Sequence, residues 1–156
     1  MRFFHKFALA SEGSALLEAT LVFPLCLSLM VGASDFGREF WTDHTLEKST
    51  RDAARYLASI QQQTGCSSWA ITNAQNLAVY GTISPPAQAQ PLIAGWQPGD
   101  WTNPSGANNV AIDCSSFPTI RVTGNVPFTY LMLAAVVPGF STSTRTFSHE
   151  ETYVGD

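Results

Sequence analysis

The sequence has little charge, and basic residues are especially few. Of its 156 residues 13% are charged, with 8 Lys and Arg against 12 Asp and Glu, for a formal net charge of -4. Proteins that bind nucleic acid neutralise phosphates with a basic surface, so this composition excludes nucleic acid as an expected partner. The length leaves room for one modest domain and an appendage.

The usual motifs of catalysis are also missing. The sequence has no Gly-x-Ser-x-Gly turn and no glycine-rich phosphate loop. Its three histidines, His5, His44 and His149, are far apart, and no Cys-His spacing resembles a zinc site. We therefore predict a protein that is not an enzyme and that needs no metal and no cofactor.

The one long hydrophobic run occupies residues 15–33. As a helix it would be about 28 Å long, close to the ~30 Å hydrocarbon core of a bilayer, so we expect a single membrane span. Arg2 and Lys6 precede the run and favour a cytoplasmic N-terminus. The rest of the chain would then lie on the other side of the membrane.

Two residues are costly inside this run. A charged carboxyl such as that of Glu18 costs roughly 2.5 to 3.5 kcal/mol in a span, so we expect it to have a partner or a proton. Pro24 has no N–H for the Thr20 carbonyl, which predicts a kink in the helix. We interpret Cys26 as a small apolar residue that packs.

A secretory signal peptide is the alternative interpretation of the same run. Residues 31–33 are small, which would suit cleavage before Ser34. A signal peptide has a basic flank and an uninterrupted apolar core, whereas Glu12 and Glu18 stand at the start of this run. The two interpretations predict different mature N-termini.

Several spaced features between residues 13 and 58 resemble one known family. A glycine, Gly13, precedes a glutamate, Glu18, with four residues between them at the head of the apolar helix. Pro24 follows, then Asp-Phe-Gly-Arg at residues 35–38 and Asp-Ala-Ala-Arg-Tyr at residues 52–56. Together these features are similar to the TadE-like pseudopilins of tight-adherence pilus systems, over less than a third of the chain.

The resemblance implies a type IV pilin-like protein that acts as a minor pseudopilin or assembly factor. A prepilin peptidase would cut after Gly13 and free Ser14 as the new N-terminus, and Glu18 would then serve assembly. An α-amino group and a carboxylate attract strongly in a low dielectric, so their pairing would relieve both charges. The implied partners are the peptidase, other pilins, the inner-membrane assembly platform and membrane lipid. The implied location is the inner membrane with a periplasmic head, or the extracellular pilus after assembly.

The helix is expected to continue beyond the membrane to about residue 60, because residues 34–60 contain no proline. An apolar stripe along it suits packing against a globular head. The stripe consists of Leu46, Thr50, Ala53, Leu57 and Ile60. Phe36, Phe40 and Trp41 suit the membrane interface.

A second stripe on this helix carries charge at every fourth residue. It starts acidic and ends basic: Asp35, Glu39, Asp43, Glu47, Arg51 and Arg55. Neighbouring like charges on one helix repel by roughly 0.2–0.5 kcal/mol per pair. We hypothesise that the acidic part meets the basic part of a staggered neighbour in a filament. The alternative is a solvated face on which Glu47 pairs with Arg51.

The remaining residues predict a small α+β head. Cys66 and Cys114 lie outside the span and should form a disulfide, with two free thiols as the alternative. We expect a helix from Ser67 or Ser68 to Tyr80 that stops at Gly81, and two antiparallel strands at 119–126 and 140–154. The apolar residues 128–137 predict a turn of helix over the core, or else a subunit contact through Leu131, Met132 and Ala135.

Residues 82–111 are predicted to form a loop, punctuated by Pro85-Pro86, Pro98-Gly99 and Asn108-Asn109. Trp96 and Trp101 in it could recognise a surface, a sugar or another subunit, or they could plug the core. We therefore divide the chain into a leader (1–13), a membrane-spanning and extended helix (14–60) and an extracytoplasmic head (61–156). The alternative function is a membrane-anchored or secreted ligand-binding or adhesion protein with no role in a filament.

Overall fold

The computed structural model describes residues 11–60, 65–137, 139 and 141–153. Most of the predicted leader, residues 1–10, lies outside the described residues, as do residues 61–64 at the expected start of the head. The chain forms two compact units. One contains Met1–Gly37 and Tyr130–Ser141, and the other contains Arg38–Thr129 and Thr142–Asp156.

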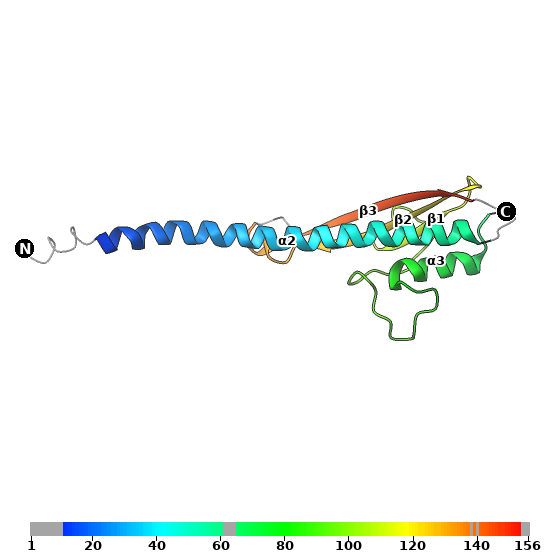
Figure 1. Cartoon of the computed structure of the whole chain (residues 1–156), viewed down its shortest axis with the longest axis horizontal. Coiled ribbons are helices and arrows are strands. Elements are labelled where there is room, and N and C mark those ends of the chain that lie inside the picture. Colours follow the sequence, from blue (N-terminus) through cyan, green and yellow to red (C-terminus); the bar gives the residue numbers. More distant parts are fainter. Residues whose placement is uncertain (1–10, 61–64, 138, 140, 154–156) are drawn as a thin grey trace, which may run out of the picture. The chain divides into compact units, whose positions relative to one another are not determined.

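The long N-terminal helix predicted from the sequence is confirmed. Helix α2 spans Ser11–Ser59, 49 residues, and continues through Pro24 (Figure 1). Beyond Gly37 its sequence contains neither glycine nor proline, so nothing in the backbone interrupts the helix before its end. Bending at Pro24 stays a prediction.

The core of the second unit forms where α2 meets the head. The predicted apolar stripe is buried there, and four of its members, Leu46, Thr50, Ala53 and Leu57, are at most 1% exposed. Helix α3 (Ser68–Tyr80) adds Ala70, Ala74 and Ala78. These small side chains allow close packing of the helix in the core.

Helix α3 begins and ends where the sequence predicted. Ser67 is the extended N-cap residue, and its carbonyl accepts the Ile71 N–H at 3.0 Å. Gly81 is left-handed, with φ 72°, and its N–H donates to the Leu77 carbonyl at 2.9 Å. Glycine adopts this conformation without the steric cost of a Cβ, so it can close the helix.

The head contains one antiparallel sheet in the order β1-β2-β3. Strand β2 (Thr119–Thr129) pairs with β3 (Thr142–Thr152) over its whole length, which confirms the predicted strand pair. Phe140 and Val154, the ends predicted for the last strand, lie outside the described residues. Pro127 is tolerated in β2 because β1 pairs with β2 only as far as Asn125. The edge of β2 at Pro127 that would face β1 therefore has no partner strand.

Strand β1 (Asn109–Asp113) corrects the prediction of a loop through residue 111. Val110 and Ile112 alternate into the core at 0% and 2% exposure. Asn109 is buried rather than part of a turn: its side-chain amide donates to the carbonyls of Asp100 and Asn103 at 2.8 and 2.6 Å. From the sequence alone, a buried asparagine that holds a loop cannot be distinguished from an asparagine in a turn at the end of a strand.

The apolar stretch 128–137 also differs in part from its prediction. Phe128 is buried at the end of β2, and one turn of helix, α4 (Leu133–Val136), forms as expected. Leu131 and Met132 before that turn are 62% and 53% exposed, and the predicted covering of the core by the turn stays a prediction. The alternative, a subunit contact, stays a prediction.

Candidate functional site

The first part of α2 presents a long, largely apolar surface. Within the described part of the chain, α2 from Ala15 onward is long and apolar enough to cross a membrane by length and composition. Its large side chains are exposed, for example Leu21 at 79% and Met30 at 68%. Side chains of this kind are stable in contact with lipid and unfavourable in water.

Polar hydroxyls inside this surface are satisfied by the helix itself. The Thr20 hydroxyl donates to the Leu17 carbonyl and the Ser28 hydroxyl to the Leu25 carbonyl, both at 2.8 Å. No water is available in a bilayer core to replace such bonds, so this arrangement suits a spanning helix. Cys26 is exposed and free on the same surface.

Glu18 is exposed on this helix, one turn after the proposed cleavage point. Gly13 and Ser14 fall in the first turn of α2, and their side chains are not described. Glu18 is the fourth residue after Ser14, which corresponds to a rise of about 6 Å in a helix. An amino group freed at Ser14 would therefore start one turn from the Glu18 carboxyl.

A comparison with protein families bears on this helix. Residues 13–55 match the model of the family described as TadE-like protein. This segment is TadE-like. The match confirms the resemblance drawn from the sequence and ends at Arg55. Searches of curated proteins and of solved structures found no match.

The TadE-like segment supports an association with the Tad pilus. It contains Gly13, Glu18 and Pro24 together with the whole charged stripe. The last turn of α2 and the whole head, residues 61–156, lie outside the match. What the head does must therefore be argued from its own geometry.

The stripe of the TadE-like segment begins at Asp35, in the first unit. Asp35 is only 1% exposed. One of its carboxylate oxygens, Oδ2, accepts the backbone N–H groups of Met132 and Leu133 at 3.0 and 2.7 Å. Sequence reasoning missed this contact because its partners lie almost one hundred residues away and are backbone groups.

In the second unit the stripe pairs with strand β3 and with itself. Arg145 of β3 pairs with Glu39, and its Nε lies 3.8 Å from the Asp43 carboxylate. Glu47 and Arg51 pair along the helix at 2.5 Å, as the alternative interpretation expected. The hypothesis of pairing between neighbouring subunits stays a prediction, and such pairing would compete with these contacts.

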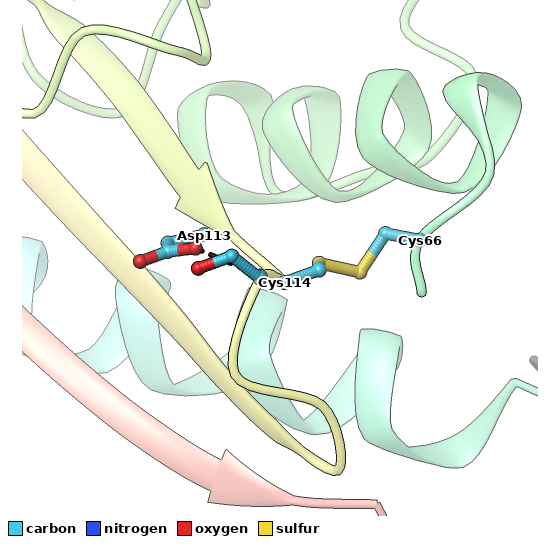
Figure 2. Close-up of a disulfide and its surroundings, with 4 residues drawn as sticks. Cys66, Asp113 and Cys114 are labelled. Carbon is cyan, nitrogen blue, oxygen red and sulfur yellow. Dashed lines mark hydrogen bonds between the residues drawn. A yellow bond between two sulfur atoms is a disulfide. The ribbon is translucent and has the colours of Figure 1, made fainter. Parts of the chain in front are cut away.

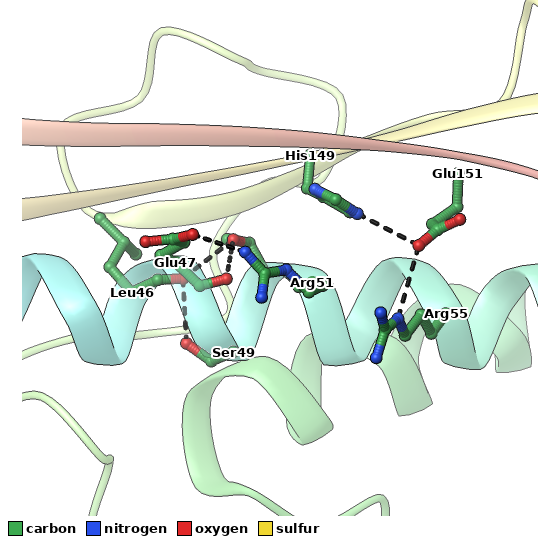
Figure 3. A network of polar contacts seen from close by, with 8 residues as sticks. Leu46, Glu47, Ser49, Arg51, Arg55, His149 and Glu151 are labelled. Carbon is green, nitrogen blue, oxygen red and sulfur yellow. Dashed lines mark hydrogen bonds and ion pairs between the residues drawn. The ribbon is translucent and has the colours of Figure 1, made fainter.

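The basic end of the stripe meets the other end of β3 (Figure 3). The Arg55 Nε lies 3.5 Å from the Glu151 carboxylate, which also contacts the His149 ring nitrogen at 3.2 Å. The hydrogen bond from His149 is the largest effect that lowers the pKa of Glu151; burial opposes it and Arg55 adds to it. The few charged residues within residues 142–152, namely Arg145, Glu150 and Glu151, were the one sequence feature that could have indicated these partners.

The head is closed by the expected disulfide between Cys66 and Cys114 (Figure 2). Their Cα atoms are 5.9 Å apart, and the bond joins the chain just before α3 to the chain just after β1. Both cysteines are partly buried and pack against the core. The disulfide therefore links a helix and a strand that lie far apart in sequence.

The two tryptophans of the long loop have different roles. Trp96 is 1% exposed and belongs to the core, so of the two interpretations left open by the sequence it plugs the core, and its part in surface recognition is wrong. Trp101 is 44% exposed, and its backbone carbonyl accepts the Ile112 N–H at 2.9 Å, which fixes it beside β1. Of these two loop tryptophans, Trp101 is therefore the one that a ligand on the surface of the head can contact.

Trp101 borders a cavity of about 440 Å³ on the sheet. The strand register sets Ala111 beside Thr123 and Ser148, and Asp113 beside Arg121 and Glu150. Apart from Glu150, these residues line the cavity with Trp101, Thr102, Pro104 and Ile112. Hydrogen bonds from Ser115 lower the pKa of Asp113, so its carboxyl stays ionised at neutral pH.

Proposed function

We propose that the protein is a minor pseudopilin or assembly factor of a tight-adherence pilus. The observation that carries this proposal is the TadE-like match on α2, a helix whose apolar surface is exposed and interrupted by one carboxylate, Glu18. The protein acts without catalysis. Its partners are a prepilin peptidase, other pilins and the inner-membrane assembly platform.

In this proposal the peptidase cuts after Gly13 and leaves Ser14 as the N-terminus. The α2 helix stays in the inner membrane with the head in the periplasm until the subunit is incorporated. A carboxylate in a span costs roughly 2.5 to 3.5 kcal/mol, and pairing of Glu18 with the freed amine, in the same subunit or the next, removes most of that cost. Where the amine belongs to the next subunit, the charge on Glu18 favours the assembled state.

Neutralising Glu18 should separate processing from incorporation. In cells with the complete pilus system, we expect Glu18→Gln to lose 13 residues like the wild type but to enter sheared pili at least about tenfold less, equivalent to ~1.4 kcal/mol. Intact mass of membrane-extracted protein measures the first effect, and quantitative immunoblotting of the pilus fraction measures the second. Asp52→Asn, an exposed acidic residue on the same helix, is the matched control.

The mature N-terminus decides among the alternatives. Ser14 supports the proposal, and Gly13→Ala should then retain the leader. An N-terminus at Ser34 would identify a secreted protein, and an intact Met1 in the presence of the peptidase would identify a permanent anchor. Normal incorporation of Glu18→Gln would contradict the role of its charge.

The cavity beside Trp101 favours a second candidate function, ligand binding by the head. An exposed indole next to hydrogen-bonding side chains can stack on the apolar face of a sugar ring while Asp113, Arg121 and Thr123 bind its hydroxyls. The lining contains one acidic and one basic residue, Asp113 and Arg121, so a neutral oligosaccharide fits better than a highly charged one.

Replacing Trp101 should test this second function. If the head binds neutral oligosaccharides, Trp101→Ala should weaken binding to an immobilised panel about tenfold or more, the loss of ~1.4 kcal/mol of contact. Trp69→Ala removes another exposed tryptophan, 57% accessible on α3, and should leave binding unchanged. Absence of wild-type binding across the panel, or equal losses in both variants, would reject carbohydrate binding at this cavity.

A further inference from the structure

The connection between β2 and β3, residues 130–141, exposes an apolar surface of its own. Its sequence, Tyr-Leu-Met-Leu-Ala-Ala-Val-Val-Pro-Gly-Phe-Ser, contains no charged residue. Leu131, Met132 and Val137 are 62%, 53% and 41% exposed. Large apolar side chains gathered at one exposed place indicate a contact that the isolated chain does not provide.

This connection is fixed to α2 at the end of the apolar run. It belongs to the same compact unit as residues 1–37. The bonds from Met132 and Leu133 to the buried Asp35 carboxylate attach the start of α4 to the helix. Asp35 lies twenty residues after Ala15, about 30 Å along a helix, which is the thickness of a hydrocarbon core. The attachment is therefore at the membrane edge if α2 spans the bilayer from Ala15.

Several backbone N–H groups of the connection also have hydrogen-bond partners, as an apolar environment requires. Asp35 satisfies two N–H groups at the start of α4, which the short helix leaves without a partner of its own. The Val137 N–H donates to the Leu133 carbonyl at 2.8 Å, and the Tyr130 N–H to the Ser141 carbonyl at 3.2 Å. Unsatisfied backbone groups prevent a loop from entering lipid, and these bonds remove that obstacle for four of them.

We propose that the β2–β3 connection inserts Leu131, Met132 and Val137 into the outer interface of the bilayer, beside the span. Lipid is the occupant because the surface belongs to the unit that contains the lipid-facing part of α2, where Phe36 is 69% and Met30 68% exposed. A connection without charge also has no group that would select a protein partner by electrostatics. The proposal rests on α2 spanning a membrane and is independent of any role in a pilus.

The consequence is a second contact with the membrane, far from the first in sequence. A single spanning helix can rotate about its own axis. A helix to which a second segment is bound at the interface has one preferred rotational orientation, because that segment must stay among the lipid headgroups. Asp35 is the positioning residue in this arrangement, since it contacts the connection and not the lipid. Its carboxylate would hold Leu131 and Met132 at the depth of the interface.

Fluorescence quenching by lipid tests the proposal. An environment-sensitive label is attached at Leu131→Cys in the full chain, with Cys26→Ala to remove the free thiol, in vesicles of phosphatidylethanolamine and phosphatidylglycerol. Lipids with a nitroxide near the top of the acyl chain should quench this label to the same extent as one at Phe36→Cys. A label at Ala87→Cys, an exposed position in the other unit, should keep its emission.

Two further measurements decide between lipid and a second copy of the chain. Quenching at residue 131 that persists when the protein is diluted in lipid supports insertion. The proposal would be overturned if the label at residue 131 were as little quenched as the label at residue 87. It would also be overturned if the emission at residue 131 changed only when unlabelled protein was added. Asp35→Ala should reduce quenching at residue 131 while leaving quenching at residue 36 unchanged, and Asp35→Asn, which keeps an acceptor oxygen, should restore part of it. Equal quenching at residue 131 in Asp35→Ala would contradict the positioning role.

Discussion

Loss of the Cys66–Cys114 disulfide is expected to lower the free energy of unfolding of the head by about 4 kcal/mol. The bond joins residues 48 apart in sequence, so it removes a large amount of conformational freedom from the unfolded chain. The head has only a small hydrophobic core, so its other contacts do little to offset the stability lost with the disulfide. Urea unfolding of the full chain in detergent micelles measures the effect. Trp96 is the fluorescent probe, because it is 1% exposed whereas the other three tryptophans are exposed.

The matched controls for this prediction come from the third cysteine and from the reduced wild type. Cys26→Ser removes an exposed, unpaired thiol and should leave the unfolding midpoint of the head unchanged. Cys66→Ser/Cys114→Ser and the wild type under reducing conditions should share one lower midpoint. A midpoint of the double variant equal to that of the oxidised wild type would show that the bond does not form or contributes nothing.

Local sequence features were sufficient to predict the helices and the longer strands. Ser67 and Gly81 delimit α3 because a cap residue and a left-handed glycine act within one turn of the helix they end. The stripe from Leu46 to Leu57 follows the helical period, so its burial could be read directly from spacing. The disulfide followed from the presence of only two cysteines outside the span.

Contacts between distant residues could not be predicted in the same way. The strand β1 was missed because it is short, and because Asn109 at its start is held by loop carbonyls that no local pattern identifies. The sequence left open whether Trp96 plugs the core or recognises a surface for a similar reason: its surroundings are assembled from several elements. The sequence also could not show that Arg145 and Glu151 on β3 pair with residues of the charged stripe.

These ion pairs change the expected meaning of the charged stripe. A sequence with charges at every fourth position suggests a surface for a neighbour, but here the head itself supplies partners for part of the stripe. The Arg55–Glu151 pair is partly exposed, and such pairs contribute little to stability, about 0 to 1 kcal/mol each, so its role is to fix the register of β3 against α2. A neighbouring subunit that used the same residues would have to displace Arg145 or Glu151 first.

Replacing Gly124 with valine is expected to destabilise the head by roughly 3 kcal/mol, at the upper end of the usual cost of overpacking. Gly124 lies in the middle of β2, at a place where the sheet lies close to α2. A Cβ at this position would come within 2.7 Å of Leu46 Cδ1, 2.8 Å of Thr50 Cγ2 and 3.2 Å of Trp96 Cζ2. All three side chains are at most 1% exposed, so they have little space into which to move.

The same urea titration measures this effect, and two further variants test its cause. Gly37→Ala, on α2 with nothing within 4 Å of the added Cβ, should be neutral or slightly stabilising, because alanine favours a helix over glycine. Thr50→Ser removes the methyl group that would lie 2.8 Å from a new Cβ but keeps the hydroxyl that bonds to the Leu46 carbonyl at 2.9 Å. Gly124→Ala combined with Thr50→Ser should therefore cost less than the sum of the two single changes, because the clash and its relief share one contact. Strict additivity would show that close packing at this point is not what requires glycine.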